Sequence, residues 1–227
     1  MVKEILTDLE KLSERSEEIT DIRKQGREVQ QLVLNLKDTA EANKFNGLAA
    51  PQIGENKRVI VIGFDGKKGK FYKSFVNPVI DYQNVKGITL STEESPVIPG
   101  KHYLMVRNNE VPLMYMTPLG QVMSTKFYGM AATVLQQMMN ALDGVQLSDM
   151  GLEVDDDFIN ASEEEKAPII EQYLRSLDIK QKAIEEEVNE SAELSQIRDA
   201  GEFIGKVNTG EVNVVVSEEK LPEKVEE

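Results

Sequence analysis

The 227-residue sequence contains no cysteine and a single histidine, His102. Without cysteine the chain can form neither disulfides nor thiolate metal sites, and one histidine excludes a cluster of imidazole ligands. We therefore expect no metal and no other cofactor. Long apolar runs are also missing, because no segment approaches the roughly 18 to 20 residues that cross a bilayer and the amino terminus lacks the apolar core of a signal peptide. These absences predict a soluble, cytoplasmic protein.

The net charge of −14 is spread unevenly along the chain. Residues 1–155 carry 18 basic against 20 acidic side chains, whereas residues 156–227 carry 8 against 20. This asymmetry predicts a nearly neutral domain over 1–155 and an acidic extension over 156–227. Because an acidic surface repels phosphate backbones and anionic lipids, we expect no nucleic-acid partner and no membrane partner. A protein partner fits this charge better.

The pattern of the first 155 residues is that of an α+β domain. Apolar residues at spacings of three and four predict an amphipathic helix over 20–42. Helix-favouring residues that end at Gly144 predict a second helix over 128–142. Short β-type runs lie between turn signals. The runs are RVIVIGF, SFVNPVI, HYLMVR, VPLMYMTP and QVMSTKFYG, and the turns are FDGKKG, SPVIPG and RNNE.

The acidic extension begins with a long helix. Ser162 and Glu165 have the spacing of a capping box, which predicts a helix over about 162–199. Apolar positions then step by four and three residues, with Gln181 as one polar position. This pattern suits either a short coiled coil or a helix packed on a neighbouring surface. The apolar positions are Ile170, Leu174, Leu177, Ile184 and Val188.

The end of the extension is typical of a β-hairpin over about 203–216, before a frayed tail. Its second run contains Val214, Val215 and Val216, which can add a strand to an exposed sheet edge. A long helix followed by a hairpin predicts an arm that contacts protein partners. Those partners include a second copy of the chain.

Two stretches of the domain resemble motifs of the peptide deformylase family. NGLAAPQIG at 46–54 is similar to the family's GLAAPQ motif, and VLQQMMNALDGV at 134–145 falls where the family has QHExDHLxGV. EESPVIPG at 93–100 stands at the family's EGCLS motif, and Arg107 has the spacing of a family arginine. The resemblance covers roughly residues 1–155. It implies the deformylase fold, with mixed β-sheets around a central helix, and a metal enzyme that removes the formyl group from the initiating methionine.

The departures from the family's pattern fall on its chemistry. Family members hold a divalent metal with the cysteine of EGCLS and both histidines of HExxH, whose glutamate acts as acid and base. The changed positions are Ser95 for the cysteine, Gln137 and Ala141 for the histidines, and Met138 for the glutamate. Pro96 replaces the leucine whose backbone N–H polarises the formyl oxygen, and proline has no N–H. Gln52, at the position of the other donor, is retained.

These departures favour the hypothesis that hydrolysis is lost. On this hypothesis the chain is a pseudoenzyme that serves as a structural or assembly module of a larger complex. A phage virion or tail is one such complex, which would place the protein in a virion rather than in the cytoplasm. The alternative hypothesis is a divergent peptide deformylase or a protein that binds formylmethionyl peptides.

Several residues in or near these motifs can be explained by a structural role as well as by a functional one. Residues 48–52 are explained either by packing of their loop against the central helix or by a retained peptide-binding groove. Met138 is expected to fill the core, because methionine suits irregular apolar gaps. Glu93 and Arg107 are expected to form a structural ion pair. His102 follows a Pro-Gly turn and is expected to be a surface or strand residue.

Overall fold

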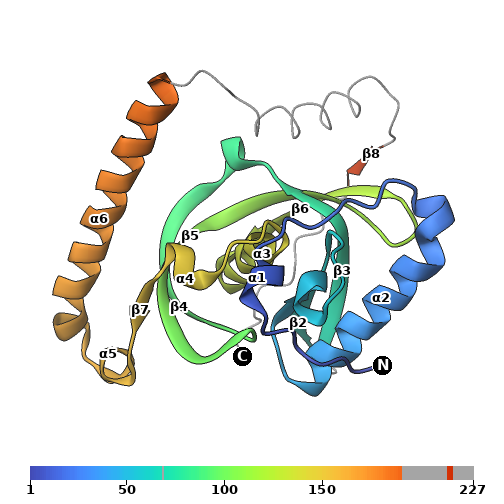
Figure 1. The fold of residues 1–227 in the computed structure, drawn as a ribbon, viewed down its shortest axis with the longest axis horizontal. Helices are drawn as coiled ribbons and strands as arrows, with labels where there is room; N and C mark the ends of the chain where they lie inside the picture. Colours follow the sequence, from blue (N-terminus) through green and yellow to red (C-terminus); the bar gives the residue numbers. More distant parts are fainter. Residues whose placement is uncertain (68, 191–213, 217–227) are drawn as a thin grey trace.

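One curved sheet encloses a central helix in the computed structural model, which describes residues 1–67, 69–190 and 214–216 (Figure 1). The strands follow the order β1-β2-β3-β5-β6-β8, and β4 and β7 also pair with β5. All pairings are antiparallel except that of β6 with β8. The strands are β1 (Gly47–Ala49), β2 (Val59–Gly66), β3 (Gly69–Ile80), β4 (Lys86–Ser95), β5 (Ile98–Met116), β6 (Val122–Tyr128), β7 (Leu152–Val154) and β8 (Val214–Val216).

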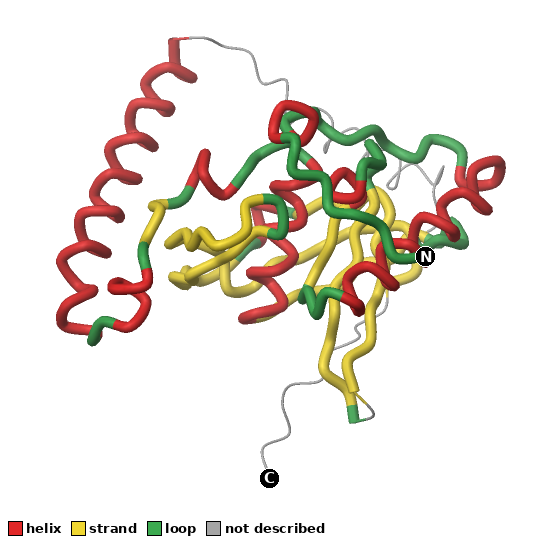
Figure 2. The backbone as a smooth tube through the Cα atoms, turned by 60° about the horizontal axis from the view of Figure 1, so that its bottom comes forward, coloured by secondary structure: helices red, strands yellow, loops and turns green. Residues whose placement is uncertain are grey.

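Helices lie inside and outside the curve of this sheet, and the chain is α+β as predicted (Figure 2). The α-helices are α1 (Leu9–Leu12), α2 (Ile22–Ala42), α3 (Gly129–Leu142), α4 (Leu147–Met150), α5 (Asp156–Asn160) and α6 (Glu163–Glu190). Two 3₁₀ turns, η1 (Ala50–Ile53) and η2 (Tyr82–Asn84), follow β1 and β3. In the part of the chain that the structure describes, no helix is long and apolar enough to span a membrane.

Helix α3 is the central helix, and its predicted position is confirmed. Apolar side chains cover most of its surface, so it can be enclosed by the sheet on several sides. Phe75 and Phe127 from the sheet pack edge to face, with ring centroids 5.5 Å apart, in the same cluster as Leu135. Met138 is 1% exposed in this cluster, which confirms that it fills the core.

Helix α2 covers the other face of β1 and β2. Its first turn is capped by the Asp21 carboxylate, which accepts hydrogen bonds from the backbone N–H groups of Arg23 and Lys24. The apolar residues of one helix face then pack on the sheet. They are Val29, Leu32, Val33 and Leu36, in one cluster with Leu48, Val59 and Val61. The prediction of an amphipathic helix over 20–42 is confirmed, although the helix begins two residues later, at Ile22.

The turn predicted at RNNE is wrong, because β5 continues through it as one strand. At Asn108 a side chain from α3 holds the backbone of the strand. The Asn108 N–H donates to Gln136 Oε1, and Gln136 Nε2 donates to the Asn108 carbonyl oxygen, both at 2.9 Å. The amide of Gln136 therefore pairs with this backbone as a neighbouring strand would, and two asparagines do not break the strand.

The first half of α6 packs on the outer face of β5 and β7. Tyr173 and Phe158 are buried there against Leu104. Ile170 and Leu177 are partly buried in the same cluster, whereas Leu174 is 40% exposed. The helix therefore packs on its own domain through positions 170, 173 and 177. Ile184 and Val188 lie in the part of α6 whose side chains the structure does not describe.

The predicted capping box at the start of α6 is confirmed. Glu165 Oε2 accepts from the backbone N–H and the hydroxyl of Ser162, both at 2.8 Å, and the Glu165 N–H donates back to the Ser162 hydroxyl at 3.3 Å. The Ser162 backbone N–H and then its hydroxyl hold the pKa of the Glu165 carboxyl below its ordinary value. Because the pKa is depressed, this contact stabilises the folded state at pH values above the carboxyl's pKa in the unfolded chain. That stabilisation is lost as the pH falls through the pKa of the folded state.

Replacing Ser162 with alanine is expected to raise the pKa of Glu165 towards its ordinary value, because one of two donors to the carboxylate is removed. A carbon-detected NMR titration of the side-chain carboxyl measures this pKa. Ser176→Ala is the control, since the Ser176 hydroxyl donates to the Tyr173 carbonyl oxygen and not to Glu165. An unchanged Glu165 titration in Ser162→Ala would contradict the capping geometry.

Strand β8 pairs in parallel with β6, with Val214 opposite Val122 and Val216 opposite Ser124. These three valines therefore add a strand to a sheet edge of their own chain. The rest of the predicted hairpin, over about 203–213, lies outside the described residues, as does the end of the predicted helix, over 191–199. Contact of this arm with a protein partner stays a prediction.

Candidate functional site

The loop that carries GLAAPQ is pressed against α3. A Cβ atom on Gly47 would lie 2.7 Å from Val134 Cγ1 and 3.0 Å from Met138 Cγ, so only glycine allows this close approach. Gln52 is 3% exposed, and its Oε1 accepts the Ala49 N–H at 2.9 Å. The loop is thus fixed by packing and by its own glutamine. Because Oε1 is engaged, the Nε2 amide is the group left to donate to a bound molecule.

The end of β4 contacts α3 at Gln137, the residue before Met138, which the GLAAPQ loop contacts. Gln137 Nε2 donates to the Glu94 carbonyl oxygen at 2.7 Å, so this side chain joins the helix to the strand. Ser95 is buried, and its hydroxyl accepts the Val97 N–H at 3.4 Å. Pro96 is half-buried beside it. The structure therefore places the end of β4, with Ser95 and Pro96, beside Gln137, and the loop that carries Gln52 beside Met138. Ala141 lies one helical turn beyond Gln137.

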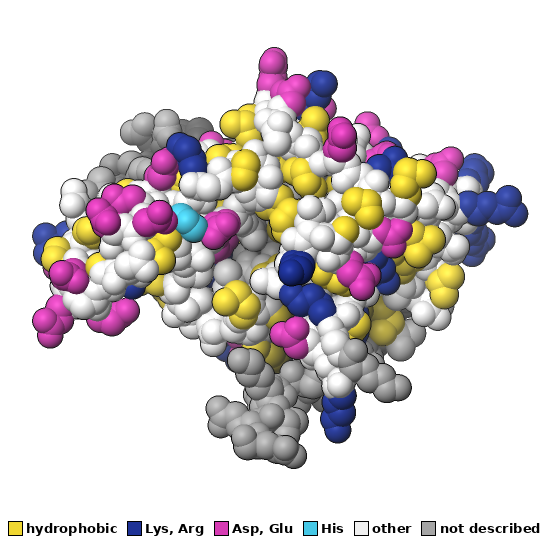
Figure 3. Space-filling view, turned by 90° about the horizontal axis from the view of Figure 1, so that it is seen from below, with side chains coloured by type: hydrophobic (Ala, Val, Ile, Leu, Met, Phe, Trp, Pro, Cys, Tyr) yellow, Lys and Arg dark blue, Asp and Glu magenta, His cyan; other side chains and the backbone are white. Residues whose placement is uncertain are grey.

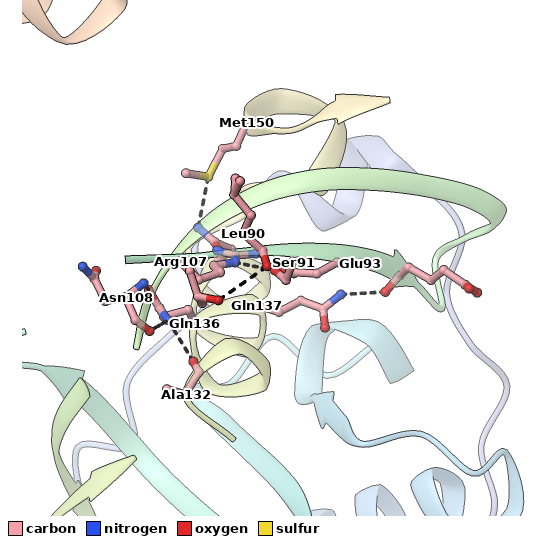
Figure 4. A network of polar contacts seen from close by, with 12 residues as sticks. Leu90, Ser91, Glu93, Arg107, Asn108, Ala132, Gln136, Gln137 and Met150 are labelled. Carbon is pink, nitrogen blue, oxygen red and sulfur yellow. Dashed lines mark hydrogen bonds and ion pairs between the residues drawn. The ribbon is translucent and has the colours of Figure 1, made fainter. Parts of the chain in front are cut away.

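A buried ion pair between β4 and β5 lies next to the contact of β4 with α3 (Figure 4). Arg107 Nε and Nη2 donate to the two oxygens of Glu93 at 2.7 and 2.8 Å, and both side chains are buried. The Ser91 hydroxyl donates to Glu93 Oε1 at 2.8 Å, and Arg107 Nη1 donates to Asn140 Oδ1 at 2.6 Å. The predicted Glu93–Arg107 pair is confirmed. It ties β4 to β5, and Asn140 ties both strands to α3.

The residues at the family's ligand positions do not fit a divalent metal. Ser95 offers a neutral hydroxyl, Gln137 an amide that already bonds Glu94, and Ala141 no donor atom. Divalent metals of this kind are held by thiolate, imidazole or carboxylate groups. Among the described residues, no group of three or more His, Cys, Asp or Glu side chains could hold an ion. The polar groups present suit hydrogen bonding to a ligand instead.

His102 lies on β5 directly opposite Glu94. Its Nδ1 is 3.2 Å from Glu94 Oε1, and its Nε2 is 3.7 Å from Asp156 Oδ1 in α5. Figure 3 shows this histidine between acidic side chains, beside a hollow in the surface. The prediction of a strand residue is confirmed, and the pair of carboxylates links the β4–β5 hairpin to the extension.

Sequence reasoning did not single out Met150, which is exposed, or Tyr173, which is buried, and the two extend the hydrogen-bond network of the ion pair towards α6. Asn140 Nδ2 donates to the thioether sulfur of Met150 at 3.3 Å, and the Met150 carbonyl oxygen accepts from the Tyr173 hydroxyl at 3.2 Å. Neither contact has a spacing that a sequence motif records. A 3.6-residue count that included aromatic side chains would have found Tyr173 between Ile170 and Leu177.

Solved structures with the same fold carry the name peptide deformylase. One from Legionella pneumophila has a TM-score of 0.60 at 24% identity, and the match covers 81% of this chain and 97% of that one. A probable peptide deformylase from the Synechococcus phage S-SSM7 has a TM-score of 0.59 at 28% identity, over 66% of this chain and 98% of that one. The predicted deformylase fold is confirmed.

A sequence relative overturns two predictions. A peptide deformylase of Pelagibacter ubique (strain HTCC1062) is 36% identical over 153 residues, which cover 65% of this chain and 85% of the relative. The prediction of a non-catalytic structural or assembly module, with its realisation as a virion component, is therefore wrong, and so is the prediction that the chain is not an enzyme. Four changed side chains and one missing backbone N–H carry less weight than a similarity that spans the domain.

The extent of the similarity decides the family. The family model described as polypeptide deformylase matches residues 2–154, which include the GLAAPQ loop, the β4–β5 hairpin and the central helix. The chain belongs to the polypeptide deformylase family.

Proposed function

We propose that this chain is a divergent peptide deformylase, which acts on peptides that begin with N-formylmethionine. The observation that carries the proposal is the family match over residues 2–154, supported by the relative that is 36% identical and named as this enzyme. The retained loop supports it further. Gln52 is buried in that loop with its Nε2 amide left to donate, which is the group a formyl oxygen requires.

Two strand edges also support a peptide ligand. In the described part of the sheet, β1 pairs only with β2 and β4 pairs only with β5, so each keeps one unpaired edge. Gly47 of β1 contacts Met138, and Glu94 of β4 contacts Gln137, so both strands approach the same turn of α3. An extended peptide can add backbone hydrogen bonds to such edges.

A second candidate function is binding of formylmethionyl peptides without hydrolysis. The specific observation in its favour is the set of donors at the site, which does not fit the divalent metal that family members use. Both candidates need the same peptide site and the same peptide class. They differ only in whether the formyl C–N bond is broken.

One experiment separates these candidates. The full chain is supplied with ferrous, nickel or cobalt ion and then with formyl-Met-Ala-Ser, and release of formate is measured beside peptide affinity by calorimetry. Unformylated Met-Ala-Ser is the control ligand. Formate release supports a deformylase, and formyl-dependent binding without release supports the second candidate. Absence of both would overturn the proposal.

Gln52→Glu sharpens this test. Glutamate keeps an oxygen to accept the Ala49 N–H but removes the Nε2 donor. We expect formyl-dependent affinity to fall at least about tenfold, because the formyl oxygen then faces a carboxylate. Gln83→Glu in η2 is the matched control, since Gln83 is exposed and lies outside the GLAAPQ loop. Equal affinities in the two variants would show that Gln52 does not contact the formyl group.

A further inference from the structure

The hydrogen-bond network that starts at the buried ion pair continues into the extension through Met150, which is 44% exposed. From β4 it passes through Glu93 to Arg107 on β5, then to Asn140 on α3. Asn140 then donates to the Met150 sulfur, and the Met150 carbonyl oxygen accepts from Tyr173 on α6. Figure 4 shows the Met150 sulfur above the Arg107 group. The network therefore joins the β4–β5 hairpin with α3, α4 and α6.

Tyr173 is held firmly at the far end of the network. It is 7% exposed and packs with Leu104 and Phe158 under the first half of α6. Burial raises the pKa of its hydroxyl, the positive charge of Arg107 lowers it and the negative charge of Glu93 raises it. The hydroxyl therefore stays protonated, as a donor requires, and lies within the field of the ion pair.

The segment that carries Met150 has little freedom of its own. A Cβ atom on Gly151 would lie 2.5 Å from Met105 Sδ and 3.0 Å from Tyr103 Cβ, so the chain crosses β5 at close range. Immediately after it, β7 pairs with β5, with Leu152 opposite Leu104. The backbone of the segment is thus fixed on the β5 side, and the Tyr173 hydroxyl fixes the carbonyl on the other side.

We propose that Tyr173 is a positioning residue for the peptide site. By holding Met150, it fixes Asn140, and through Asn140 it fixes the Arg107–Glu93 pair that sets β4 against α3. The extension is then part of the site's support and not only an appendage. This inference rests on the proposed function for its effect on peptide binding, whereas the link between Tyr173 and Arg107 holds independently of any peptide.

A double-mutant cycle tests the effect on the site. Tyr173→Phe removes only the hydroxyl, and Met150→Leu removes the sulfur acceptor at similar volume. We expect each to weaken formyl-Met-Ala-Ser binding about two- to tenfold, the effect of one lost hydrogen bond. The double variant should lose no more than the larger single effect, because both changes break one path. Additive losses would overturn the inference.

A second measurement does not involve the peptide. Exchange of the Arg107 Nε–H with solvent, followed by NMR, reports how firmly the ion pair is held. We expect exchange to be about two- to tenfold faster in Tyr173→Phe, and unchanged in Leu174→Ala, a control on the exposed side of the same helix. Unchanged exchange in Tyr173→Phe would overturn the inference. Failure of the parent chain to bind peptide would instead overturn the proposed function, and the exchange rates would still decide whether Tyr173 acts on Arg107.

Discussion

Replacing Arg107 with methionine is expected to lower the free energy of unfolding by about 3–5 kcal/mol. The guanidinium is 4% exposed and makes two hydrogen bonds to Glu93, so its loss leaves a buried carboxylate whose remaining donor is the Ser91 hydroxyl. A lysine at this position is expected to recover only part of the loss, because an ammonium cannot donate to both oxygens and to Asn140 in the same planar arrangement. Urea denaturation followed by circular dichroism measures the change.

Two further variants separate the causes of this loss. Arg175→Met removes an exposed pair with Glu171 on α6 and is expected to cost at most about 1 kcal/mol. Arg107→Met combined with Glu93→Leu removes both charges and is expected to be more stable than Arg107→Met alone, since no uncompensated charge stays buried. If Arg107→Met cost no more than Arg175→Met, the buried pair would not support the site.

The two main helices could be predicted from the sequence, because their signals are local. In α2 the apolar spacing lies within the helix and the Asp21 cap directly precedes it, and Gly144 follows the C-cap of α3. The resemblance placed Gln52, Ser95 and Gln137 around one site, and in the structure Gln137 bonds the residue before Ser95 while the loop of Gln52 packs on the same turn of α3. These features depend on residues that are near in sequence or aligned to a known motif.

Features that depend on distant partners could not be predicted. Strand β4 has an exposed face with few apolar residues, so KGITLSTEES shows no β-type run. The asparagines at 108 and 109 look like a turn, and only the Gln136 side chain, far along the chain, explains why β5 continues. The heptad count placed Leu174 on the packed face, whereas the sheet selects Tyr173. In each instance tertiary contacts override the local pattern.

Three glycines allow a matched test of how firmly residues 12–16 pack against the end of α3. Gly144 has a φ of +75°, and a Cβ atom there would lie 2.2 Å from the Ser13 carbonyl oxygen. Gly100 has a nearly equal φ of +77° with open space around it, and Gly26 lies inside α2 with open space and no positive φ. The three positions therefore separate backbone strain from a steric clash.

Alanine at these positions is expected to have three different effects on the free energy of unfolding. Gly26→Ala should stabilise by about 0.5–1 kcal/mol, because alanine favours a helix. Gly100→Ala should destabilise by about 1 kcal/mol through the left-handed backbone alone. Gly144→Ala should destabilise by about 2–4 kcal/mol, because overpacking against a backbone atom adds to the same strain. Urea denaturation of all three variants gives the comparison.

The difference between Gly144→Ala and Gly100→Ala is the informative quantity, since it isolates contact with residues 12–16. That segment makes one hydrogen bond to the end of α3, from the Ser16 N–H to the Leu142 carbonyl oxygen at 2.8 Å, and accepts another at the Leu12 carbonyl oxygen from Gln146 Nε2, in the loop after α3, at 3.1 Å. A clash at Gly144 must move the segment or the helix, and α3 carries Met138 and Gln137 of the site. Equal losses in the two variants would mean that the segment yields freely and does not hold α3 in place.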